Sequence, residues 1–191
     1  MAHISIIGAG KMGQAINAAL GRGGNTIDLL GKKDADKPVN GDIVVLAVPY
    51  PAVEQVLAQR PGQLDNKIVV DITNPLNFET FDSLVVPADS SAAAQIAAKL
   101  PNARLLKAFN TTFAGTLAEG TVGPLATTVL IAGDDADAKA TLVDVVTASG
   151  LRAIDAGSLK RAREMEALGF LQISLASNQK VSWSGGFGVV D

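Results

Sequence analysis

Residues 3–16 read HISIIGAGKMGQAI, and they say more about the architecture than any other segment of the 191-residue chain. The apolar, β-branched run at 3–7 predicts a strand, and the spacing of apolar residues after Gly10 predicts a helix. Between the two stands GAGKMG, which fits the pattern G-x-G-x-x-G. A strand, a glycine turn and a helix in this order are typical of the first βαβ unit of a dinucleotide-binding fold.

Each glycine of the turn has a physical role in that interpretation. Gly8 permits the tight turn, Gly10 leaves room for a pyrophosphate, and Gly13 lets the helix lie close to the strand. The free N–H groups and the positive end of the helix then face the diphosphate. The alternative is an ordinary glycine turn that binds nothing. We expect the dinucleotide to contact the whole turn: Gly8, Ala9, Gly10, Lys11, Met12 and Gly13.

The rest of the chain alternates short apolar runs with Ala-rich helical patterns, as α/β proteins with a mainly parallel sheet do. Strands are expected at 3–7, 26–30, 42–48, 67–72, 104–109, 127–132 and 152–154, and helices at 11–22, 51–59, 90–100, 134–150 and 158–177. We therefore predict an α/β, three-layer Rossmann fold with a doubly wound, mainly parallel sheet and a small C-terminal helical lobe. Residues 1–155 would form the dinucleotide-binding Rossmann domain. Residues 156–191 would be a C-terminal helix and tail packed on it, within one structural domain.

The connection between the second and third strands is unusually short. It runs over residues 31–41, whereas a parallel crossover usually needs a dozen residues or more, often with a helix. Its sequence, GKKDADKPVNG, has no apolar face to pack, so we expect a bare loop with no helix. Residues 73–89 are expected to form a long loop, and the tail 178–191 has no assignment.

Composition excludes several kinds of site and partner. The chain has no cysteine, which rules out disulfides, thiolate catalysis and zinc–thiolate sites. A net charge of −3 offers no basic field for nucleic acid. The longest apolar stretch, 43–53, is too short to span a bilayer, and the N-terminal run opens into the glycine turn as a first strand does, unlike a signal peptide. Because the aspartates lack metal-ligand spacing, we expect no metal. The apolar stretch and the N-terminal run lead us to expect no membrane contact and a cytoplasmic protein.

The end of the second strand bears on the choice of nicotinamide cofactor. An NAD site has Asp or Glu about 20 residues beyond the glycines, bonded to the ribose 2′-hydroxyl. Here the chain reads Gly31-Lys32-Lys33, and lysine pairs with a dianionic 2′-phosphate. This favours NADP (NADPH). Two alternatives stay open: the lysines belong to a solvated loop, or Asp28 is the ribose-binding acid. We prefer NADP because Asp28 lies inside the strand pattern.

Groups for proton transfer are scarce at the carboxyl edge of the predicted sheet, where ligands bind in such folds. His3 is the only histidine, and it lies at the amino end of the first strand. Tyr50 and Lys107 are the only comparable candidates near the correct edge, and neither can be assigned, so the catalytic residues stay unknown. Hydride transfer between a nicotinamide and a flavin-like acceptor fits this scarcity, because it needs positioning more than a dedicated acid.

Polar side chains follow the fourth and fifth strands. Thr73-Asn74-Pro75 closes the fourth, and Phe109-Asn110-Thr111 closes the fifth. Both place polar groups where a nicotinamide carboxamide and a second ring would lie. Turn chemistry explains them equally well, because Asn and Thr start turns routinely.

Five motifs occur together in this chain: GAGKMGQAI at 8–16, LAVPY at 46–50, DITNPL at 71–76, KAFNT at 107–111 and DAGSLKRARE at 155–164. In this order they resemble the deazaflavin (coenzyme F420)-dependent NADP oxidoreductases and their bacterial relatives, a group that includes the reductase domain of the STEAP ferric reductases. The resemblance covers roughly residues 3–175. It implies an NADP-binding Rossmann domain with a small C-terminal lobe, and a flavin, a deazaflavin or another small electron acceptor as second substrate.

The resemblance also implies which residues bind. Gly31, Lys32 and Lys33 match the turn that holds the 2′-phosphate in the family. Further cofactor contacts would fall on Ala47, Val48, Pro49, Tyr50, Thr73, Asn74 and Pro75, and the substrate pocket would comprise Leu76, Asn77, Phe109 and Asn110. A homodimer is implied as well, and the apolar stripe of the last helix would serve partly in the dimer and partly in the core. That stripe consists of Leu159, Ala162, Met165, Leu168 and Leu175.

Two other functions remain open. Pyrroline-5-carboxylate reductases, which reduce imines, begin with a similar GAGxMGxAI segment and a V-L-A-V strand. They also need a sizeable helical dimerisation domain, where this sequence offers the helix from 158 and a short tail. A non-catalytic NADP sensor or partner-binding module fits the missing general acid as well as an enzyme does.

Overall fold

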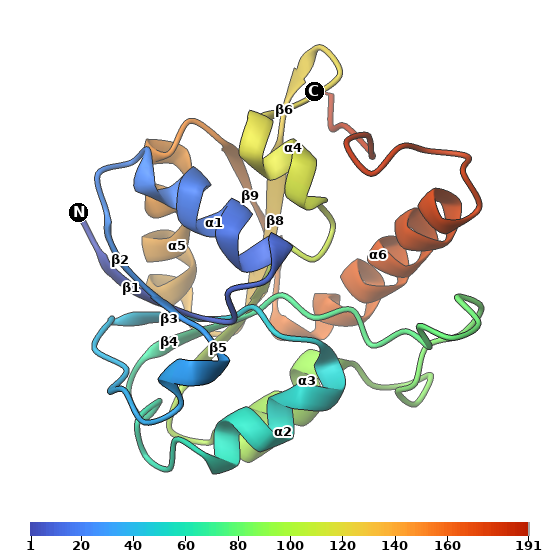
Figure 1. The fold of residues 1–191 in the computed structure, drawn as a ribbon. Coiled ribbons are helices and arrows are strands. Elements are labelled where there is room, and N and C mark those ends of the chain that lie inside the picture. The colour runs from blue at the N-terminus through green and yellow to red at the C-terminus, as the bar shows by residue number, and fades with distance from the viewer. Residues whose placement is uncertain (191) are drawn as a thin grey trace.

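A seven-stranded sheet lies between two layers of helices in the computed structural model, which describes residues 1–190 (Figure 1). The strands lie in the order β2-β1-β3-β4-β5-β8-β9, and a separate hairpin pairs β6 with β7. The strands are β1 His3–Ile7, β2 Thr26–Leu30, β3 Ile43–Leu46, β4 Ile68–Asp71, β5 Arg104–Ala108, β6 Thr121–Val122, β7 Leu125–Ala126, β8 Thr128–Gly133 and β9 Arg152–Gly157. The helices are α1 Lys11–Gly21, α2 Tyr50–Ala58, α3 Ala92–Lys99, α4 Ala114–Glu119, α5 Ala136–Ala148 and α6 Ala162–Ser177, with 3-10 turns η1 Lys32–Asp34 and η2 Leu159–Arg161.

The two helical layers bury the two faces of the sheet in separate cores. One core joins α1, α4 and α5 to the sheet and contains Ile16, Leu117 and Leu142. The other joins α2 and α3 to the opposite face and contains Val53 and Ile96. The central strands are covered on both sides, which explains why they are continuous apolar runs without alternation. The predicted α/β, three-layer Rossmann fold with a doubly wound sheet and a C-terminal helix is confirmed.

The sheet is parallel from β2 to β5, whereas β8 runs antiparallel to β5 and β9 follows β8 in parallel. The short α4 accounts for the reversal. It has 6 residues, so it is about 9 Å long, whereas a five-residue strand is about 16 Å long. Such a connection does not carry the chain back to the amino edge of the sheet. Strand β8 therefore starts at the edge where β5 ends.

Side chains cap the starts of two helices. The Ser91 hydroxyl accepts the N–H of Ala94 at 3.0 Å, and a carboxylate oxygen of Asp135 accepts the N–H of Ala138 at 2.8 Å. Most predicted ends agree with the structure to within two residues, although β9 extends three residues further than expected. The helix expected from residue 158 is divided, because η2 precedes α6. Helix α4 and the hairpin β6–β7 had no predicted counterpart.

The expectation of a bare loop between β2 and β3 is wrong in two respects. The segment contains the 3-10 turn η1, in which a carboxylate oxygen of Asp34 accepts the N–H of Gly31 at 2.8 Å. It is also anchored to the body of the protein. The buried guanidinium of Arg60 donates to the carbonyl oxygens of Lys37 at 2.7 Å and Asp34 at 2.9 Å, and Val39 is buried in the core beside α2. One cationic side chain thus replaces the helix that usually shapes this crossover.

Helix α6 stands at one end of the molecule, and two long segments flank it (Figure 1). The loop 73–89 contains a single isolated bridge, between Leu76 and Leu84, and it is tied to α6 where the Ser174 hydroxyl donates to the Phe81 carbonyl at 3.0 Å. The tail continues from α6 to the neighbourhood of β9, where Arg152 donates to the Val189 carbonyl at 3.1 Å. The last residue of the predicted C-terminal segment, 191, lies outside the described residues.

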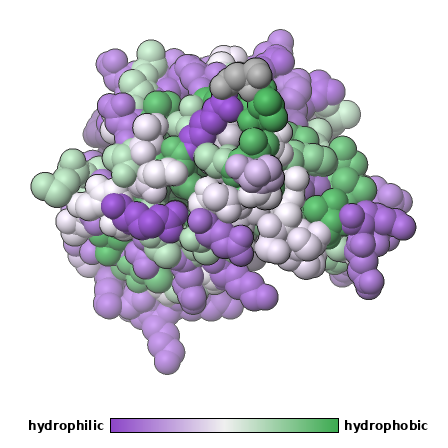
Figure 2. Space-filling view, turned by 90° about the horizontal axis from the view of Figure 1, so that it is seen from above, coloured by the Kyte–Doolittle hydropathy of each residue, from purple (hydrophilic) through white to green (hydrophobic). Residues whose placement is uncertain are grey.

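The surface seen from the side of α1 and α4 mixes hydrophilic and hydrophobic areas (Figure 2). Within residues 1–190, no helix is both long enough and apolar enough to cross a membrane. Beyond the N-terminal Met1, the exposed large hydrophobic side chains lie in the loop 73–89, on α6 and in the tail. They are Phe78, Val85, Leu171, Trp183, Phe187, Val189 and Val190. Apolar exposure is therefore concentrated around the C-terminal lobe.

Candidate functional site

A cavity of about 530 Å³ opens at the carboxyl ends of β1, β3, β4 and β5. This is the edge at which the chain order reverses between β1 and β3, and open α/β sheets bind their ligands at such a switch point. The volume lies within the range of small-molecule sites. Its lining comprises Gly10, Lys11, Met12, Ala47, Val48, Pro49, Tyr50, Ile72, Thr73, Asn74, Phe78, Asn110, Thr112, Phe113, Ala114, Gly115, Gly169, Gln172, Ile173 and Trp183.

The glycine turn has the geometry that a bound pyrophosphate requires. Gly8 has a φ of +120°, and a Cβ added there would overlap the carbonyl oxygen of Ala47. A Cβ on Gly13 would overlap the carbonyl oxygen of Gly8, so this glycine lets α1 lie against the turn. A Cβ on Gly10, in contrast, would meet nothing within 4 Å. Two glycines are therefore required by the protein itself, and the third faces open space.

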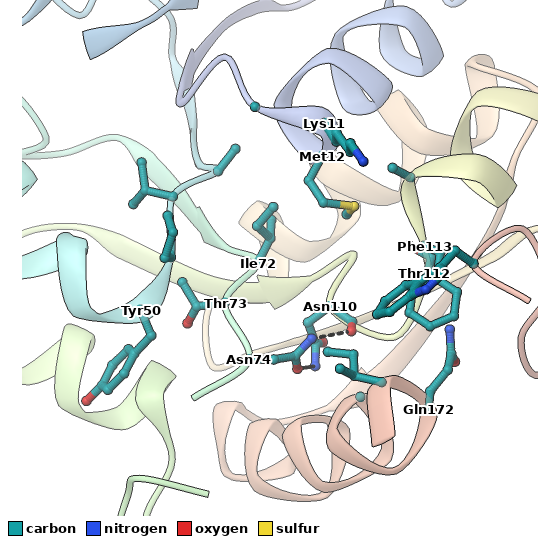
Figure 3. A pocket seen from close by; sticks show the side chains of 18 of the residues that line it. Lys11, Met12, Tyr50, Ile72, Thr73, Asn74, Asn110, Thr112, Phe113 and Gln172 are labelled. Carbon is teal, nitrogen blue, oxygen red and sulfur yellow. Dashed lines mark hydrogen bonds between the residues drawn. The ribbon is translucent and has the colours of Figure 1, made fainter. Parts of the chain in front are cut away.

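The first turn of α1 offers free backbone donors beside that space. Gly10 is the N-cap and has an extended conformation, with no side chain to accept a hydrogen bond from the helix. The N–H groups of the first turn have no partner inside the helix, and the helix dipole adds positive potential at this end. Lys11 and Met12 line the cavity from the same turn (Figure 3). An anionic group is the natural ligand for such a terminus.

The cationic residues after β2 stand next to the glycine turn. A Cβ on Gly31 would lie 3.6 Å from the Cβ of Ala9. Lys32 and Lys33 are exposed, and within the described chain neither forms an ion pair. The nearby Asp34 is already occupied, because Lys37 binds it at 2.8 Å and holds the pKa of this carboxyl below its ordinary value.

Asp28, the alternative ribose-binding acid, lies inside β2 and pairs with His3. The imidazole Nε2 and a carboxylate oxygen of Asp28 are 2.7 Å apart. The only histidine therefore lies outside the cavity lining, with Asp28 as its partner.

Tyr50 contributes to the cavity wall, but its hydroxyl points away from the cavity centre (Figure 3). The hydroxyl donates to the side-chain oxygen of Gln95 on α3 at 2.6 Å. Burial raises the pKa of Tyr50, and the charge of Glu166 adds to the effect. The phenol is thus neutral and committed to Gln95, which leaves it poorly placed as a proton donor to a ligand.

Lys107 is fully buried beneath the cavity and forms two ion pairs. Its ammonium lies 2.8 Å from a carboxylate oxygen of Asp71 and 2.9 Å from one of Glu166, and it also donates to the carbonyl oxygen of Thr73 at 2.5 Å. All three of its donors are therefore used. The other oxygen of Asp71 accepts the N–H of Thr73 at 2.8 Å. Lys107 consequently fixes the backbone at the end of β4 and does not face a ligand.

Glu166 extends this network to two helices. Its two oxygens accept the N–H groups of Ala92 at 2.8 Å and Ala93 at 3.2 Å, at the start of α3. Burial raises the pKa of Glu166, and the nearby Lys107 opposes the shift. One lysine thus faces two buried carboxylates, and the cluster joins β4, β5, α3 and α6 below the cavity.

Two asparagines form the floor of the cavity between β4 and α6. The Asn110 amide donates to Asn74 Oδ1 and to the Met165 carbonyl, both at 2.9 Å, and the Asn74 amide donates to the Asn110 carbonyl at 2.8 Å (Figure 3). Helix α6 approaches closely here, because a Cβ on Gly169 would overlap Asn74 Oδ1. The carboxamides therefore have fixed orientations.

Several buried polar atoms of the cavity lining lack a protein partner. Thr73 Oγ1, Asn110 Oδ1 and Gln172 Oε1 have no hydrogen bond among the described residues. Their residues are 3%, 4% and 2% exposed. Leaving a buried polar group unpaired costs about 1–3 kcal/mol, so a ligand with hydrogen-bond donors is the expected partner.

Phe109 acts through its backbone. Its φ is +62°, and the N–H of Asn110 donates to the carbonyl of Ala108 at 2.8 Å, which closes a tight three-residue turn at the end of β5. This conformation is rare for a residue with a side chain. The ring is fully buried in the core and does not line the cavity, so the turn serves to aim Asn110.

The structure brings together ten of the residues predicted from the sequence: Gly10, Lys11, Met12, Ala47, Val48, Pro49, Tyr50, Thr73, Asn74 and Asn110. Others lie behind the lining or beyond it, namely Gly8, Ala9, Gly13, Gly31, Lys32, Lys33, Pro75, Leu76, Asn77 and Phe109. Leu76 is buried in the structured loop after β4, and Asn77 caps a turn of that loop through its side-chain oxygen.

The wall formed by α4, α6 and the tail was not predicted from the sequence. Its members are Thr112, Phe113, Ala114, Gly115, Gly169, Gln172, Ile173 and Trp183, together with Ile72 and Phe78. The sequence pattern that could have identified these residues is weak, because α4 is short and the tail has no hydrophobic periodicity. In the described residues, no three His, Cys, Asp or Glu side chains are grouped so that they could hold a metal ion.

Known proteins resemble this chain in sequence. Residues 32–75 match the family model described as NADP oxidoreductase, coenzyme F420-dependent. The chain is 32% identical over 190 residues to the F420-dependent NADP reductase of Methanocaldococcus jannaschii, an alignment that covers 94% of this chain and 85% of that protein. It is also 32% identical over 133 residues to the metalloreductase STEAP3 of Rattus norvegicus, covering 70% of this chain and 26% of that protein.

A solved structure extends the likeness to the whole fold. A protein of Arthrobacter sp. FB24, provisionally described as an F420-dependent NADP reductase, superposes with a TM-score of 0.86 and covers 100% of both chains. The sequence identity is 24%, so this likeness shows the fold alone.

Proposed function

This chain belongs to the family of coenzyme F420-dependent NADP oxidoreductases, and we propose that it transfers a hydride between the nicotinamide of NADP(H) and a flavin-like acceptor. It is an NADP-dependent oxidoreductase. The observation that carries the proposal is the cavity at the switch point, which combines an open helix N-terminus with buried, unpaired hydrogen-bonding atoms. NADPH supplies the hydride when bound, and the chain supplies binding, orientation and exclusion of water.

The residues of the turn fit the diphosphate and ribose parts of NADP. The open space over Gly10 and the free N–H groups of α1 would take the pyrophosphate. Lys32 and Lys33, which lie beyond the turn, would pair with the 2′-phosphate, and Gly31 keeps their loop close to Ala9. The remaining proposed cofactor contacts are those after β3 and β4: Ala47, Val48, Pro49, Tyr50, Thr73, Asn74 and Pro75.

The floor of the cavity would orient the nicotinamide. Thr73 Oγ1 and Asn110 Oδ1 are unpaired acceptors, and a carboxamide N–H₂ group is the complementary donor. Asn110 is held by Asn74 and Met165, so it would present its oxygen without further rearrangement. Such preorganised contacts are what a hydride transfer needs, because the two reacting rings must lie in contact in one orientation.

The test is a pair of calorimetric titrations with NADPH and NADH, on the natural protein and on a Lys32→Ala, Lys33→Ala variant. We expect NADPH to bind more tightly than NADH, and the variant to lose at least about tenfold in NADPH affinity, or 1.4 kcal/mol, with little change for NADH. A Lys160→Ala, Lys180→Ala variant is the control, since it removes the same charge from exposed positions elsewhere.

Equal affinities, or an equal loss in the control, would contradict the 2′-phosphate site. Turnover assays with NADPH and acceptors of several classes address the other functions considered from the sequence. Reduction of cyclic imines in preference to flavins would favour an imine reductase. Tight binding of NADPH with no oxidation by any acceptor would favour a sensor.

A homodimer and a cytoplasmic location are further proposals. The exposed apolar side chains around α6, Leu171 and Val85 among them, support an interface at the C-terminal lobe. Light scattering after size exclusion measures the mass directly, and a monomer at micromolar concentration would contradict the dimer.

A further inference from the structure

We propose that Gln172 is the residue that recognises the electron acceptor, and that Phe113 and Trp183 form the wall against which the acceptor ring packs. The inference rests on the proposed hydride transfer and deepens it. It assigns to the acceptor a planar conjugated ring that carries an N–H donor at its edge. A quinone, which has no such donor, and a ferric complex would not use this residue.

Gln172 lies in the part of the cavity wall that α6 forms. It projects from α6 into the cavity on the side of Phe113, whereas Thr73 lies toward Tyr50 on the other side (Figure 3). The residue is 2% exposed, and Oε1 has no hydrogen-bond partner among the described residues. A buried carboxamide oxygen in this state favours any ligand that brings a donor to it.

The surroundings of Gln172 leave its side chain little freedom. A Cβ on Gly186 would lie 3.1 Å from Nε2 of Gln172, so the tail packs directly against the amide. A Cβ on Gly115 would lie 3.1 Å from the Cα of Ser184, so the same tail also packs on α4. Helices α4 and α6 are thus bridged by the tail, and the amide is held at the cavity wall.

Phe113 and Trp183 form an aromatic pair in the cavity wall. The rings of Phe113 and Trp183 have centroids 5.0 Å apart and planes inclined by 55°. Both residues line the cavity, and Trp183 is 54% exposed although it is the only tryptophan of the chain. A flat ligand can pack against a large, half-exposed indole beside a buried ring, because aromatic rings favour contact with one another beyond the burial of their area.

The chemistry of the acceptor follows from the two observations together. The pyrimidinedione edge of a flavin or deazaflavin has a ring N–H between two carbonyl groups. That N–H is a donor for Gln172 Oε1, while the fused rings have the shape to pack on Trp183. In the reaction NADPH loses a hydride to the central ring of the acceptor, which also takes one proton from solvent, so NADP⁺ and the two-electron-reduced acceptor are the products.

The experiment compares riboflavin and an 8-hydroxy-5-deazaflavin with their derivatives methylated at that ring nitrogen, as acceptors for NADPH. With the natural protein we expect methylation to lower kcat/KM at least about tenfold, mainly through KM, because it removes the donor and leaves Oε1 unpaired. With Gln172→Met we expect a low kcat/KM that is the same for both forms. Gln172→Glu, which keeps an acceptor oxygen, should restore part of the discrimination.

Gln55→Met is the matched control, because Gln55 is exposed on α2. Calorimetry with NADPH should give the same Kd for all of these proteins, which separates a local effect from misfolding. The proposal is overturned if the natural protein treats methylated and unmethylated rings alike, or if menadione or ferric citrate is reduced as fast as the flavins and Gln172→Met changes nothing. Failure of NADPH to bind would instead overturn the proposed function.

Discussion

Gly10 is the residue at which stability and binding separate most cleanly. Its conformation, φ −74° and ψ −175°, suits any residue, and a Cβ there meets no protein atom within 4 Å. We expect Gly10→Ala to cost no more than about 1 kcal/mol of unfolding free energy, yet to weaken NADPH binding at least tenfold, because the methyl group occupies the space of the pyrophosphate. Urea unfolding and calorimetry measure the two quantities.

Gly13→Ala is the contrasting variant, since its Cβ would overlap the Gly8 carbonyl oxygen. It should destabilise the protein itself. If Gly10→Ala bound NADPH as the natural protein does, the pyrophosphate would not cross this glycine.

Lys107 neutralises two buried carboxylates, so its loss should destabilise the protein. Lys107→Met leaves Asp71 and Glu166 buried without their cation, so we expect a loss of about 3–5 kcal/mol in unfolding free energy. Lys139→Met is the control, because Lys139 pairs with Asp155, whose side chain is 51% exposed, and such a pair contributes about 1 kcal/mol or less. Similar losses in both variants would show that Lys107 is not the centre of the cluster.

The sequence indicated the importance of some of these residues and not of others. The roles of the three glycines could be predicted, because Gly8 and Gly13 lie against backbone of the βαβ unit and Gly10 faces open space. Lys107 could not be placed, since its burial depends on Glu166, which is 59 residues away in the chain and reaches it only through α6. Gln172 looked like any polar residue of an amphipathic helix.

At the scale of elements, Glu166 makes the attachment of α6 depend on pH. Burial raises the pKa of Glu166 above its ordinary value of 4.5, so ionisation is less favourable in the folded than in the unfolded chain. Its stabilising contribution is complete below pH 4.5 and is lost as the pH rises through the raised pKa. We therefore expect the stability of the natural protein relative to Glu166→Gln to fall as the pH rises above 4.5, measured by urea unfolding.

Glu54→Gln is a control of opposite sign. The hydrogen bond from Lys99 holds the pKa of Glu54 below its ordinary value, so this group contributes above that value and loses its contribution as the pH falls. The pair is exposed, and its effect should be small. A relative stability of Glu166→Gln that does not change with pH would mean that Lys107 fully compensates the burial of the carboxylate.

The crossover between β2 and β3 carries a second prediction at this scale. Arg60→Met removes the two hydrogen bonds that hold the loop of Lys32 and Lys33. We expect a loss of about 2–4 kcal/mol in stability, because two carbonyl groups lose their charged donor. The affinity for NADPH should fall more than the affinity for NADH. Arg104→Met, which removes a single 3.3 Å bond to Asn66, should do neither.

Elements with a clear apolar pattern over many residues were predicted well. Short elements that depend on tertiary contacts were not predicted. The strands β1 to β5 are mostly apolar, and β3 and β4 are almost entirely so, which allowed their positions to be predicted. The turn η1 depends on Asp34 capping its own start, and α4 spans only 6 residues that include a glycine. Such short pieces carry too little periodicity to be recognised before the fold is known.

We expect the whole molecule to unfold in one cooperative transition, in which residues 1–155 and 156–190 melt together. The ion pair of Lys107 with Glu166 and the core beside α2 and α3 both include residues from each of these two parts. Saturation with NADPH at about 100 times its Kd should add about 2.7 kcal/mol and raise Tm by about 5–10 °C. Differential scanning calorimetry measures both. Two separate transitions would show that the C-terminal lobe is an independent unit.

The single tryptophan gives this protein an optical property that follows from its place in the fold. Trp183 lies in the wall of the cavity. The chain has one tryptophan and one tyrosine. The tryptophan fluorescence of the natural protein therefore depends on the surroundings of Trp183 in that wall. A reduced nicotinamide absorbs where an indole emits, so energy transfer from Trp183 should follow each arrival and departure of NADPH in real time, without any label.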